Sequence, residues 1–314
     1  MYSRIVAAAL AASATEAASG VYNYNSLGAD WSEVNELCGT GKEQSPIDLV
    51  KWNTNRHPDQ KIEGFNYRNY GPEAGLGIIK ETDTFKMAFT DGRLNVTLPP
   101  SGEEENETRS NFYPIQLHFH APSEHTVNGM HFDLEMHIVH TYQDGSLGGV
   151  LGIFFDVEKG GAGLTEATRK PDQWMYAGAG QNSDFIEQLM FKEATPEGYA
   201  LGNVDLATFL ASVDMRKYWH YDGSLTTPPC TEGIKWHVIE EVQTISERQL
   251  EQFTKHFAGD ENYAGGNGNH RVIQELGDRK LYYVDDYSRW DWFKEGSGAA
   301  TLVAGMAATL LTLF

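Results

Sequence analysis

The stretch Gln116-Leu117-His118-Phe119-His120 decides how the rest of the chain is interpreted. It alternates polar and apolar residues, which predicts a half-buried β-strand. Because side chains on a strand alternate between its two faces, His118 and His120 project to the same side, about 7 Å apart. Two imidazoles on one face can bind one metal ion, and three with an open fourth position are the arrangement of catalytic zinc.

A third histidine ligand must come from another segment. His137 ends the stretch Leu134-Glu135-Met136-His137, which also has strand character. His125, His131 and His140 lie close to it in the sequence, and spacing alone does not decide between these candidates.

The wider pattern predicts one β-rich domain. Strand-like segments rich in alternating, β-branched or aromatic residues, each bounded by Gly, Pro, Asn or Asp, cover 78–89, 115–120, 134–140, 150–157 and 235–242. Helices are expected at 184–192, 205–211 and 246–257, the last with a Ser246 cap. Strands therefore dominate, with short helices at the edges, and neither an internal repeat nor a long linker divides the domain.

The charge balance excludes some partners. The chain carries 24 basic and 44 acidic residues, for a net charge of −20. Such a surface repels nucleic-acid phosphates and anionic lipid head groups, so no nucleic-acid partner is expected. The excess predicts a well-solvated acidic surface. Adaptation to high salt, where screening weakens the repulsion between carboxylates, is the alternative hypothesis.

Both ends of the chain have the character of targeting segments. Residues 1–19 predict a signal peptide, because Arg4 precedes a short apolar run followed by small residues. The predicted domain then spans 20–293. The apolar tail 294–314, with small residues at 296–298, predicts a GPI-attachment signal, and a short membrane helix is the alternative. We expect a secreted protein or one on the extracellular face of the plasma membrane, with membrane contact only through a lipid anchor.

Two further features fit a secreted chain. Cys38 and Cys230 are its only cysteines, and an even count in an oxidising compartment favours one disulfide closing a very long loop. Asn95 and Asn106 each begin an Asn-X-Thr sequon, so both are candidate glycosylation sites.

Three ordered blocks carry a family resemblance. The segment from Gln116 to His140 contains SEHTV (123–127), a second block reads YDGSLTTPP (221–229) and is followed by Trp236, and a third reads QSPID (44–48). Together they resemble the alpha-class carbonic anhydrases over roughly residues 22–285. The resemblance implies a single domain around a large, mostly antiparallel twisted sheet with short peripheral helices. It also implies zinc-dependent, reversible hydration of carbon dioxide to bicarbonate and a proton by a zinc-bound hydroxide.

The resemblance assigns the metal centre residue by residue. His118, His120 and His137 would bind Zn²⁺. Gln116 and Glu135 match the partners that accept the remaining imidazole N–H of these ligands, which fixes the tautomer of each ring. The implied disulfide joins Cys38 to Cys230 and braces the loop that carries Thr226.

Further positions match catalytic and substrate-contacting residues of the family. Glu124 would accept the hydroxyl proton of Thr226, which then orients the attacking hydroxide, and Thr227 would contact bicarbonate. The family's apolar wall for carbon dioxide matches five positions: Val139, Val150, Leu225, Ile234 and Trp236. Sulfonamides are the inhibitors that the resemblance implies.

One position departs from the family pattern. Fast members carry a histidine that relays protons at the pocket mouth, and this chain has Asp83 there. An ordinary carboxyl, with a pKa of about 3.9, is poorly matched to a relay that works best near 7. Asp83 is therefore a candidate for a weak proton shuttle. Two rival functions remain: an inactive binding or adhesion module of the same fold, and an esterase that uses the same centre.

Overall fold

A computed structural model describes residues 22–51, 66–68, 77–81, 83–89, 93–98, 108–157, 181–201, 204–257 and 268–285. The chain divides into two compact units, Met1–Val284 and Asp285–Phe314. The described elements all lie in the first unit, apart from the final residue of the last strand. The predicted boundaries at residues 19 and 293 lie outside the described residues and stay predictions.

A large, mainly antiparallel sheet forms the centre of the first unit. Among the described residues it has twelve strands, and its main order is β10 (Tyr199–Ala200), β3 (Gly77–Lys80), β4 (Phe85–Ala88), β6 (Thr108–His120), β8 (Leu134–Thr141), β9 (Leu147–Asp156), β12 (Glu232–Ile239), β11 (Lys217–Ser224) and β14 (Tyr282–Asp285). Three further strands lie off this order. The strand β5 (Arg93–Leu98) pairs with β6 and also with β2 (Asn66–Arg68), and β13 (Gln243–Thr244) pairs with β9. Both β12 and β13 run parallel to β9. The predicted fold class is confirmed.

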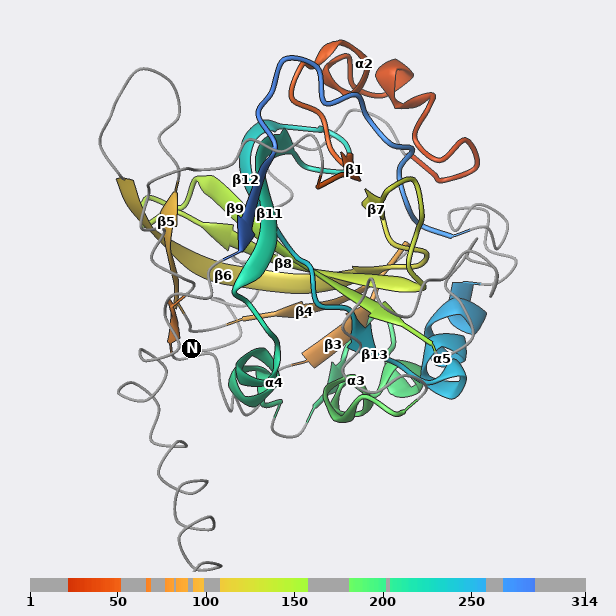
Figure 1. The fold of residues 1–314 in the computed structure, drawn as a ribbon. Coiled ribbons are helices and arrows are strands. Elements are labelled where there is room, and N and C mark those ends of the chain that lie inside the picture. Colours follow the sequence, from red (N-terminus) through yellow and green to blue (C-terminus); the bar gives the residue numbers. More distant parts are fainter. Residues whose placement is uncertain are drawn as a thin grey trace, which may run out of the picture. The chain divides into compact units, whose positions relative to one another are not determined.

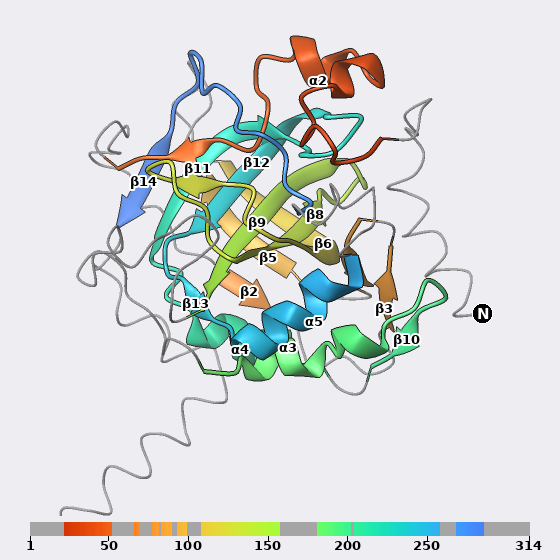
Figure 2. The ribbon, with the colours of Figure 1, turned by 90° about the vertical axis from the view of Figure 1, so that its right-hand side faces the viewer.

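Short helices lie on one side of this sheet and the N-terminal segment lies on the other (Figures 1 and 2). The first group is α3 (Asp184–Gln188), η2 (Phe191–Glu193), α4 (Leu206–Ser212) and α5 (Glu247–Phe257). On the opposite side lie η1 (Trp31–Glu33), α2 (Leu37–Thr40) and a small parallel pair, β1 (Asp48–Leu49) with β7 (Thr126–Val127). The sheet therefore separates a helix-covered core from a second side covered by the N-terminal segment and the small β1–β7 pair.

Two predicted elements are broken in the structure. The segment 78–89 forms a hairpin of β3 and β4 rather than one strand, and its turn is closed by a hydrogen bond from the Glu81 N–H to the Thr84 carbonyl. The predicted helix 184–192 ends at Gln188, because Met190 adopts a left-handed conformation with φ of 50° before η2 begins. By contrast, Ser246 caps α5 as expected, accepting from the N–H of Gln249.

Apolar side chains fill both sides of the sheet. On the helix side, Phe85, Phe119 and Phe253 form part of one large buried cluster. On the other side, a smaller cluster includes Phe154 and Trp236. Burial on both sides explains why β9 has buried residues along nearly its whole length instead of alternating.

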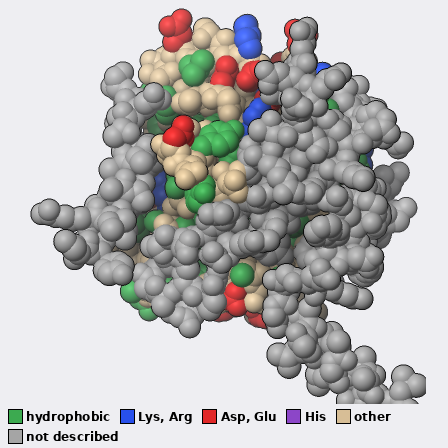
Figure 3. Space-filling model, turned by 90° about the vertical axis from the view of Figure 1, so that its left-hand side faces the viewer, with side chains coloured by type: hydrophobic (Ala, Val, Ile, Leu, Met, Phe, Trp, Pro, Cys, Tyr) green, Lys and Arg blue, Asp and Glu red, His purple; other side chains and the backbone are tan. Residues whose placement is uncertain are grey.

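The described residues include only some of those on which the targeting and surface predictions depend. Residues 1–19, the tail 294–314 and Asn106 lie outside the described residues, while Asn95 lies on β5. None of the helices in the described ranges is long and apolar enough to cross a membrane. Among the described side chains that are coloured on the face in Figure 3, acidic and basic groups are interspersed.

Buried histidine on the helix side predicts sensitivity to acid. Burial lowers the pKa of His140 from 6.5 to about 3. Below pH 6.5 the unfolded chain takes up a proton that the folded chain does not, so stability falls as the pH drops until the folded group also titrates near 3. Between pH 6.5 and 4.5 this one group should cost about 2 kcal/mol. In urea unfolding, His140→Leu should lose less stability than the wild type over that range, and an equal loss in both proteins would contradict the prediction.

Candidate metal centre

Three imidazoles from two neighbouring strands converge on one point. His118 lies directly opposite His137 in the register of β6 and β8, and His120 follows two residues later on the same face. One ring nitrogen from each of the three lies within 4.8 Å of the others. The ring centroids are 4.9 Å apart for His118 and His120, 5.2 Å for His118 and His137, and 4.7 Å for His120 and His137. The structure thus brings together the three predicted ligands.

The hydrogen bonds of the three rings leave one nitrogen of each facing the common centre. His118 Nδ1 lies 2.8 Å from Gln116 Oε1, and His137 Nε2 lies 2.8 Å from Glu135 Oε1. His120 Nδ1 lies 2.7 Å from the carbonyl oxygen of Asn269, a partner that the sequence did not reveal. Because each of these oxygens accepts an N–H, the second nitrogen of each ring carries the lone pair.

The chemistry of these nitrogens fits a bound cation. His120 Nε2 is buried and has no hydrogen-bond partner in the described part of the chain, which is costly for a polar atom unless another ligand satisfies it. Burial, reinforced by His137, lowers the pKa of His120 to about 3. Burial also lowers the pKa values of His118 and His137, so all three rings are neutral near pH 7. Neutral imidazole is the form that binds metal, and Zn²⁺ accepts three such ligands.

Glu135 connects this centre to a buried network. Its Oε1 accepts from His137 and, at 2.7 Å, from His125 Nδ1, while its Oε2 accepts the backbone N–H groups of Glu124 and His125. Burial alone would raise the pKa of Glu135, but the two imidazoles and their hydrogen bonds lower it well below its usual value. Gly152 leaves room for this carboxylate, since a Cβ there would lie 3.1 Å from Oε1.

A second possible metal group is less suitable. His125, Glu135 and His137 also place their ligand atoms within 4.8 Å of one another. However, His125 uses both ring nitrogens, because its Nε2 lies 2.6 Å from the hydroxyl of Tyr221. Both histidines of this second group are hydrogen-bonded to Glu135. The group therefore supports the ligand His137 and does not form a separate metal site.

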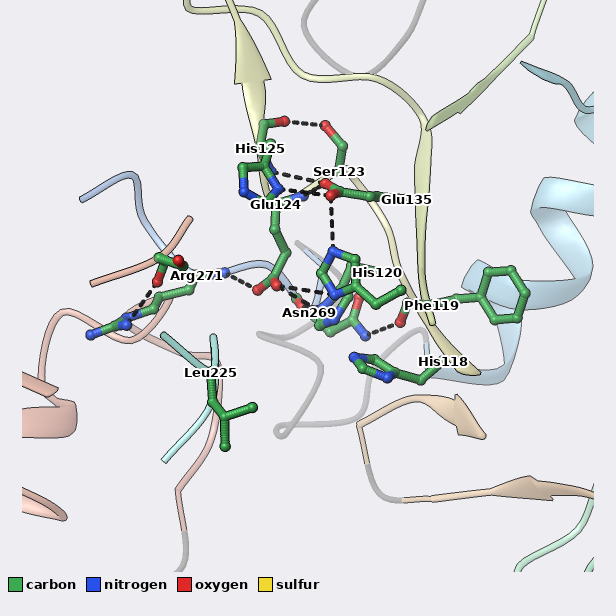
Figure 4. Close-up of polar contacts among 12 residues, drawn as sticks. His118, Phe119, His120, Ser123, Glu124, His125, Glu135, Leu225, Asn269 and Arg271 are labelled. Atoms are coloured by element: carbon green, nitrogen blue, oxygen red, sulfur yellow. Dashed lines mark hydrogen bonds and ion pairs between the residues drawn. The ribbon is translucent and has the colours of Figure 1, made fainter. Parts of the chain in front are cut away.

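Glu124 lies beside the ring of His120 (Figure 4), and its Oε2 is 3.9 Å from His137 Nδ1. Its Oε2 is 3.4 Å from His120 Nε2, and its Oε1 accepts the backbone N–H of Arg271 at 3.0 Å. Burial raises the pKa of Glu124 well above its usual value, and the hydrogen bond with the Thr226 hydroxyl opposes this shift. A divalent cation at the histidines would favour the ionised carboxylate. Glu124 and Thr226 are therefore in contact, as the resemblance implies.

Arg271 and the disulfide hold the segments around this pair. The buried Arg271 guanidinium donates to Gln44 Oε1 and to the backbone carbonyls of Ser45 and Cys38. The predicted disulfide between Cys38 and Cys230 is present, with the two Cα atoms 5.2 Å apart. The Cys230 N–H donates to the carbonyl of Thr227, so the bridge fastens the loop that carries the two threonines.

An apolar surface adjoins the centre. Val139 pairs with Val150 across β8 and β9, and Val150 pairs with Trp236 across β9 and β12, so the three side chains form one row. The Trp236 ring lies 4.8 Å from the ring of His137. Ile234 and the half-buried Leu225 belong to the same cluster. The structure therefore collects all five predicted wall residues on the side of the sheet that carries the histidines.

Asp83 lies in the turn between β3 and β4 and contacts a residue that sequence reasoning missed. Its Oδ2 accepts the hydroxyl of Tyr22 at 2.9 Å. Burial raises the pKa of Asp83 from 3.8, and the Tyr22 hydrogen bond partly offsets this. Lys86 lies opposite His118 in the register of β4 and β6, and its ammonium pairs with Glu81 at 2.6 Å. The charged side chains of Glu81 and Lys86 thus lie close enough to act on Asp83.

The fold and the site together define a class: single-domain metalloenzymes with a three-histidine centre on a twisted sheet. The family model for eukaryotic-type carbonic anhydrase matches residues 27–285, and the chain belongs to this family. The family reaction is carbon dioxide hydration, and the family is zinc-dependent.

Several known proteins are similar to this chain. Alpha carbonic anhydrase 4 of Arabidopsis thaliana is 29% identical over 261 residues, which cover 81% of each chain. Dioscorin dioA3 of Dioscorea japonica is 31% identical over 267 residues, covering 85% of this chain and 83% of the dioscorin. The alpha-carbonic anhydrase of Thermovibrio ammonificans in complex with the inhibitor sulfanilamide is 28% identical, with a TM-score of 0.59 over 81% of this chain and 94% of that one.

Proposed function

We propose that this protein hydrates carbon dioxide at a Zn²⁺ ion held by His118, His120 and His137. The observation that carries the proposal is the set of three neutral imidazoles, each with one nitrogen bonded to an oxygen acceptor and the other directed at a common centre. When bound, Zn²⁺ would lower the pKa of a water ligand to about 7, the value established for carbonic anhydrases.

Glu124 and Thr226 would orient the attacking oxygen. With Glu124 ionised, the Thr226 hydroxyl donates to the carboxylate, and the threonine oxygen can then only accept a hydrogen from the nucleophile. This directs a lone pair of the nucleophile toward the substrate carbon. The Thr226 backbone N–H is the candidate donor to the oxygen on which charge develops, and Thr227 is the candidate contact for bicarbonate.

The apolar row beside the centre would hold the substrate. Carbon dioxide is small and has no net dipole, so it gains little from hydrogen-bonding groups and is favoured by a surface that excludes water. Val139, Val150 and Trp236 supply such a surface next to His137.

Asp83 is the candidate group for proton export, and we expect it to limit turnover in dilute buffer. A carboxylate that accepts a hydrogen bond from Tyr22 is a weaker base than an imidazole that titrates near 7, so it is less suited to accepting the proton that must leave the centre. Asp83→His should raise the hydration rate in dilute buffer about tenfold and bring it closer to the rate in concentrated buffer. Asp83→Asn is the control that removes the titrating group. If wild-type turnover is already fast and independent of buffer concentration, the expectation is wrong.

The proposed function is tested by measuring metal and reaction together. Zinc-loaded protein should hydrate carbon dioxide in stopped-flow assays, lose that activity on chelation, regain it with Zn²⁺ and be inhibited by sulfanilamide. A binding module would show no hydration at any zinc content. An esterase would cleave esters without hydrating carbon dioxide.

We also propose that the protein acts outside the cell. The disulfide between Cys38 and Cys230 supports an oxidising compartment. Removal of residues 1–19, glycosylation at Asn95 and Asn106, and lipid attachment before the apolar tail would follow in that pathway. Release of activity from intact cells by a phosphatidylinositol-specific phospholipase would support the lipid anchor, and retention on the membrane would favour a short membrane helix.

A further inference from the structure

A second pair of histidines has the spacing of the metal centre but no place in the proposed reaction. The rings of His131 and His270 lie 5.0 Å apart at an interplanar angle of 67°. The ligand pairs of the candidate centre have centroid separations between 4.7 and 5.2 Å. The two rings are therefore as close to each other as imidazoles that share one cation.

His131 is held in the tautomer that a metal ligand needs. Its Nδ1 lies 2.6 Å from the carbonyl oxygen of Ser123, so this nitrogen carries the proton and Nε2 carries the lone pair. The same arrangement, an Nδ1 proton on a backbone carbonyl, holds His120 through Asn269. The His131 side chain is half-buried, which leaves an approach from solvent.

His270 offers an independent sign of a missing ligand. Its Nδ1 is buried and has no hydrogen-bond partner among the described residues. Burial and the neighbouring His131 lower the pKa of His270 to about 4, so the ring is neutral at pH 7 and able to bind metal. Asp48 adds a negative charge close enough to act on His131, which favours a cation at this place.

The pair joins two segments that support the catalytic residues. His131 is hydrogen-bonded to the backbone carbonyl of Ser123, the residue before Glu124. In the sequence, His270 lies between Asn269, whose carbonyl accepts from His120, and Arg271, whose backbone N–H donates to Glu124. Figure 4 shows Asn269 and Arg271. An ion bound by both rings would therefore tie these two segments together.

We propose that His131 and His270 form an auxiliary site for a divalent transition-metal ion, separate from the catalytic centre. Imidazole nitrogen suits Zn²⁺, Ni²⁺ and Cu²⁺ rather than Mg²⁺ or Ca²⁺, and water would complete the coordination. Because the ion binds the folded arrangement of the two segments, it stabilises the native state by mass action. The site does not depend on the proposed reaction.

Ni²⁺ titration of tag-free, zinc-loaded protein tests this proposal by calorimetry and thermal unfolding. Wild-type protein should bind one further equivalent of Ni²⁺ and unfold at a higher temperature in its presence. His131→Gln and His270→Phe should each weaken that binding at least tenfold, a loss that even indirect changes around metal ligands produce. Magnesium should have no such effect.

Two controls separate this site from the catalytic one. His118→Ala should lose the catalytic zinc and keep the Ni²⁺-dependent stabilisation, so failure of the proposed function would leave this result intact. His131→Gln, at a half-buried position, keeps the test valid if His270→Phe does not fold, which circular dichroism would reveal. Ni²⁺ binding that is absent in the wild type, or unchanged in both variants, overturns the proposal.

Discussion

His118→Ala is expected to abolish stoichiometric zinc binding and to reduce carbon dioxide hydration about 10³-fold or more. Two imidazole ligands remain, but the third ligand is lost together with its hydrogen bond to Gln116. A 10³-fold loss corresponds to about 4 kcal/mol of transition-state stabilisation. Zinc content by atomic absorption and hydration by stopped flow, on the same preparation, measure both effects.

Controls decide whether this loss is chemical rather than structural. Lys255→Ala, at an exposed side chain of α5 that pairs only with exposed Glu251 among the described residues, should keep full zinc content and activity. Gln116→Ala leaves the ligand and removes only its hydrogen-bond acceptor, so zinc affinity should fall by about 10–100-fold. Full activity of His118→Ala with normal zinc content would reject the assignment of this ligand.

Thr226→Ala should reduce the hydration rate about 100-fold while leaving zinc bound. The variant removes the hydroxyl that contacts Glu124 but none of the imidazoles. Losing one oriented hydrogen-bonding group at a reacting centre typically costs 10²–10³ in rate. Glu124→Gln should cause a loss of similar size, because the amide cannot act solely as an acceptor for the threonine proton.

The two residues should behave as one unit. The double variant Thr226→Ala with Glu124→Gln should be little slower than either single variant, since removing one partner already disables the other. Thr226→Ser keeps the hydroxyl and should retain most of the activity. Independent, multiplicative losses in the double variant would show that the contact between the two side chains has no catalytic role.

Several parts of the site could be predicted because they depend on local geometry or on ordered motifs. The alternation in residues 116–120 placed His118 and His120 on one face, and the structure agrees. The pairing of Cys38 with Cys230 followed from the count of cysteines and from the family blocks, and the bridge is present.

Other parts are set by contacts between distant segments and left no local signal. Asn269 supports His120 through a backbone carbonyl, a group that every residue carries. Tyr22 reaches Asp83 across 61 positions, and nothing in the composition near either residue indicates this pairing. The sequence analysis also missed the turn inside 78–89, because the apolar residues before and after this turn resemble one continuous strand.

The sequence by itself determined the fold class, the family and the two ligands on β6, because strand periodicity and contiguous motifs are properties of neighbouring residues. Spacing alone did not decide which further histidine completes the centre; the family resemblance indicated His137, and the tertiary structure shows the geometry that selects it. His125, His131, His137 and His140 were equivalent by spacing, but the register between β6 and β8 sets His137 opposite His118. The same packing bonds His125 to Glu135, buries His140 on the helix side and brings His131 against His270. The physical reason is that a metal site needs nitrogen atoms to converge in space, and convergence between strands depends on their pairing, which no single segment encodes.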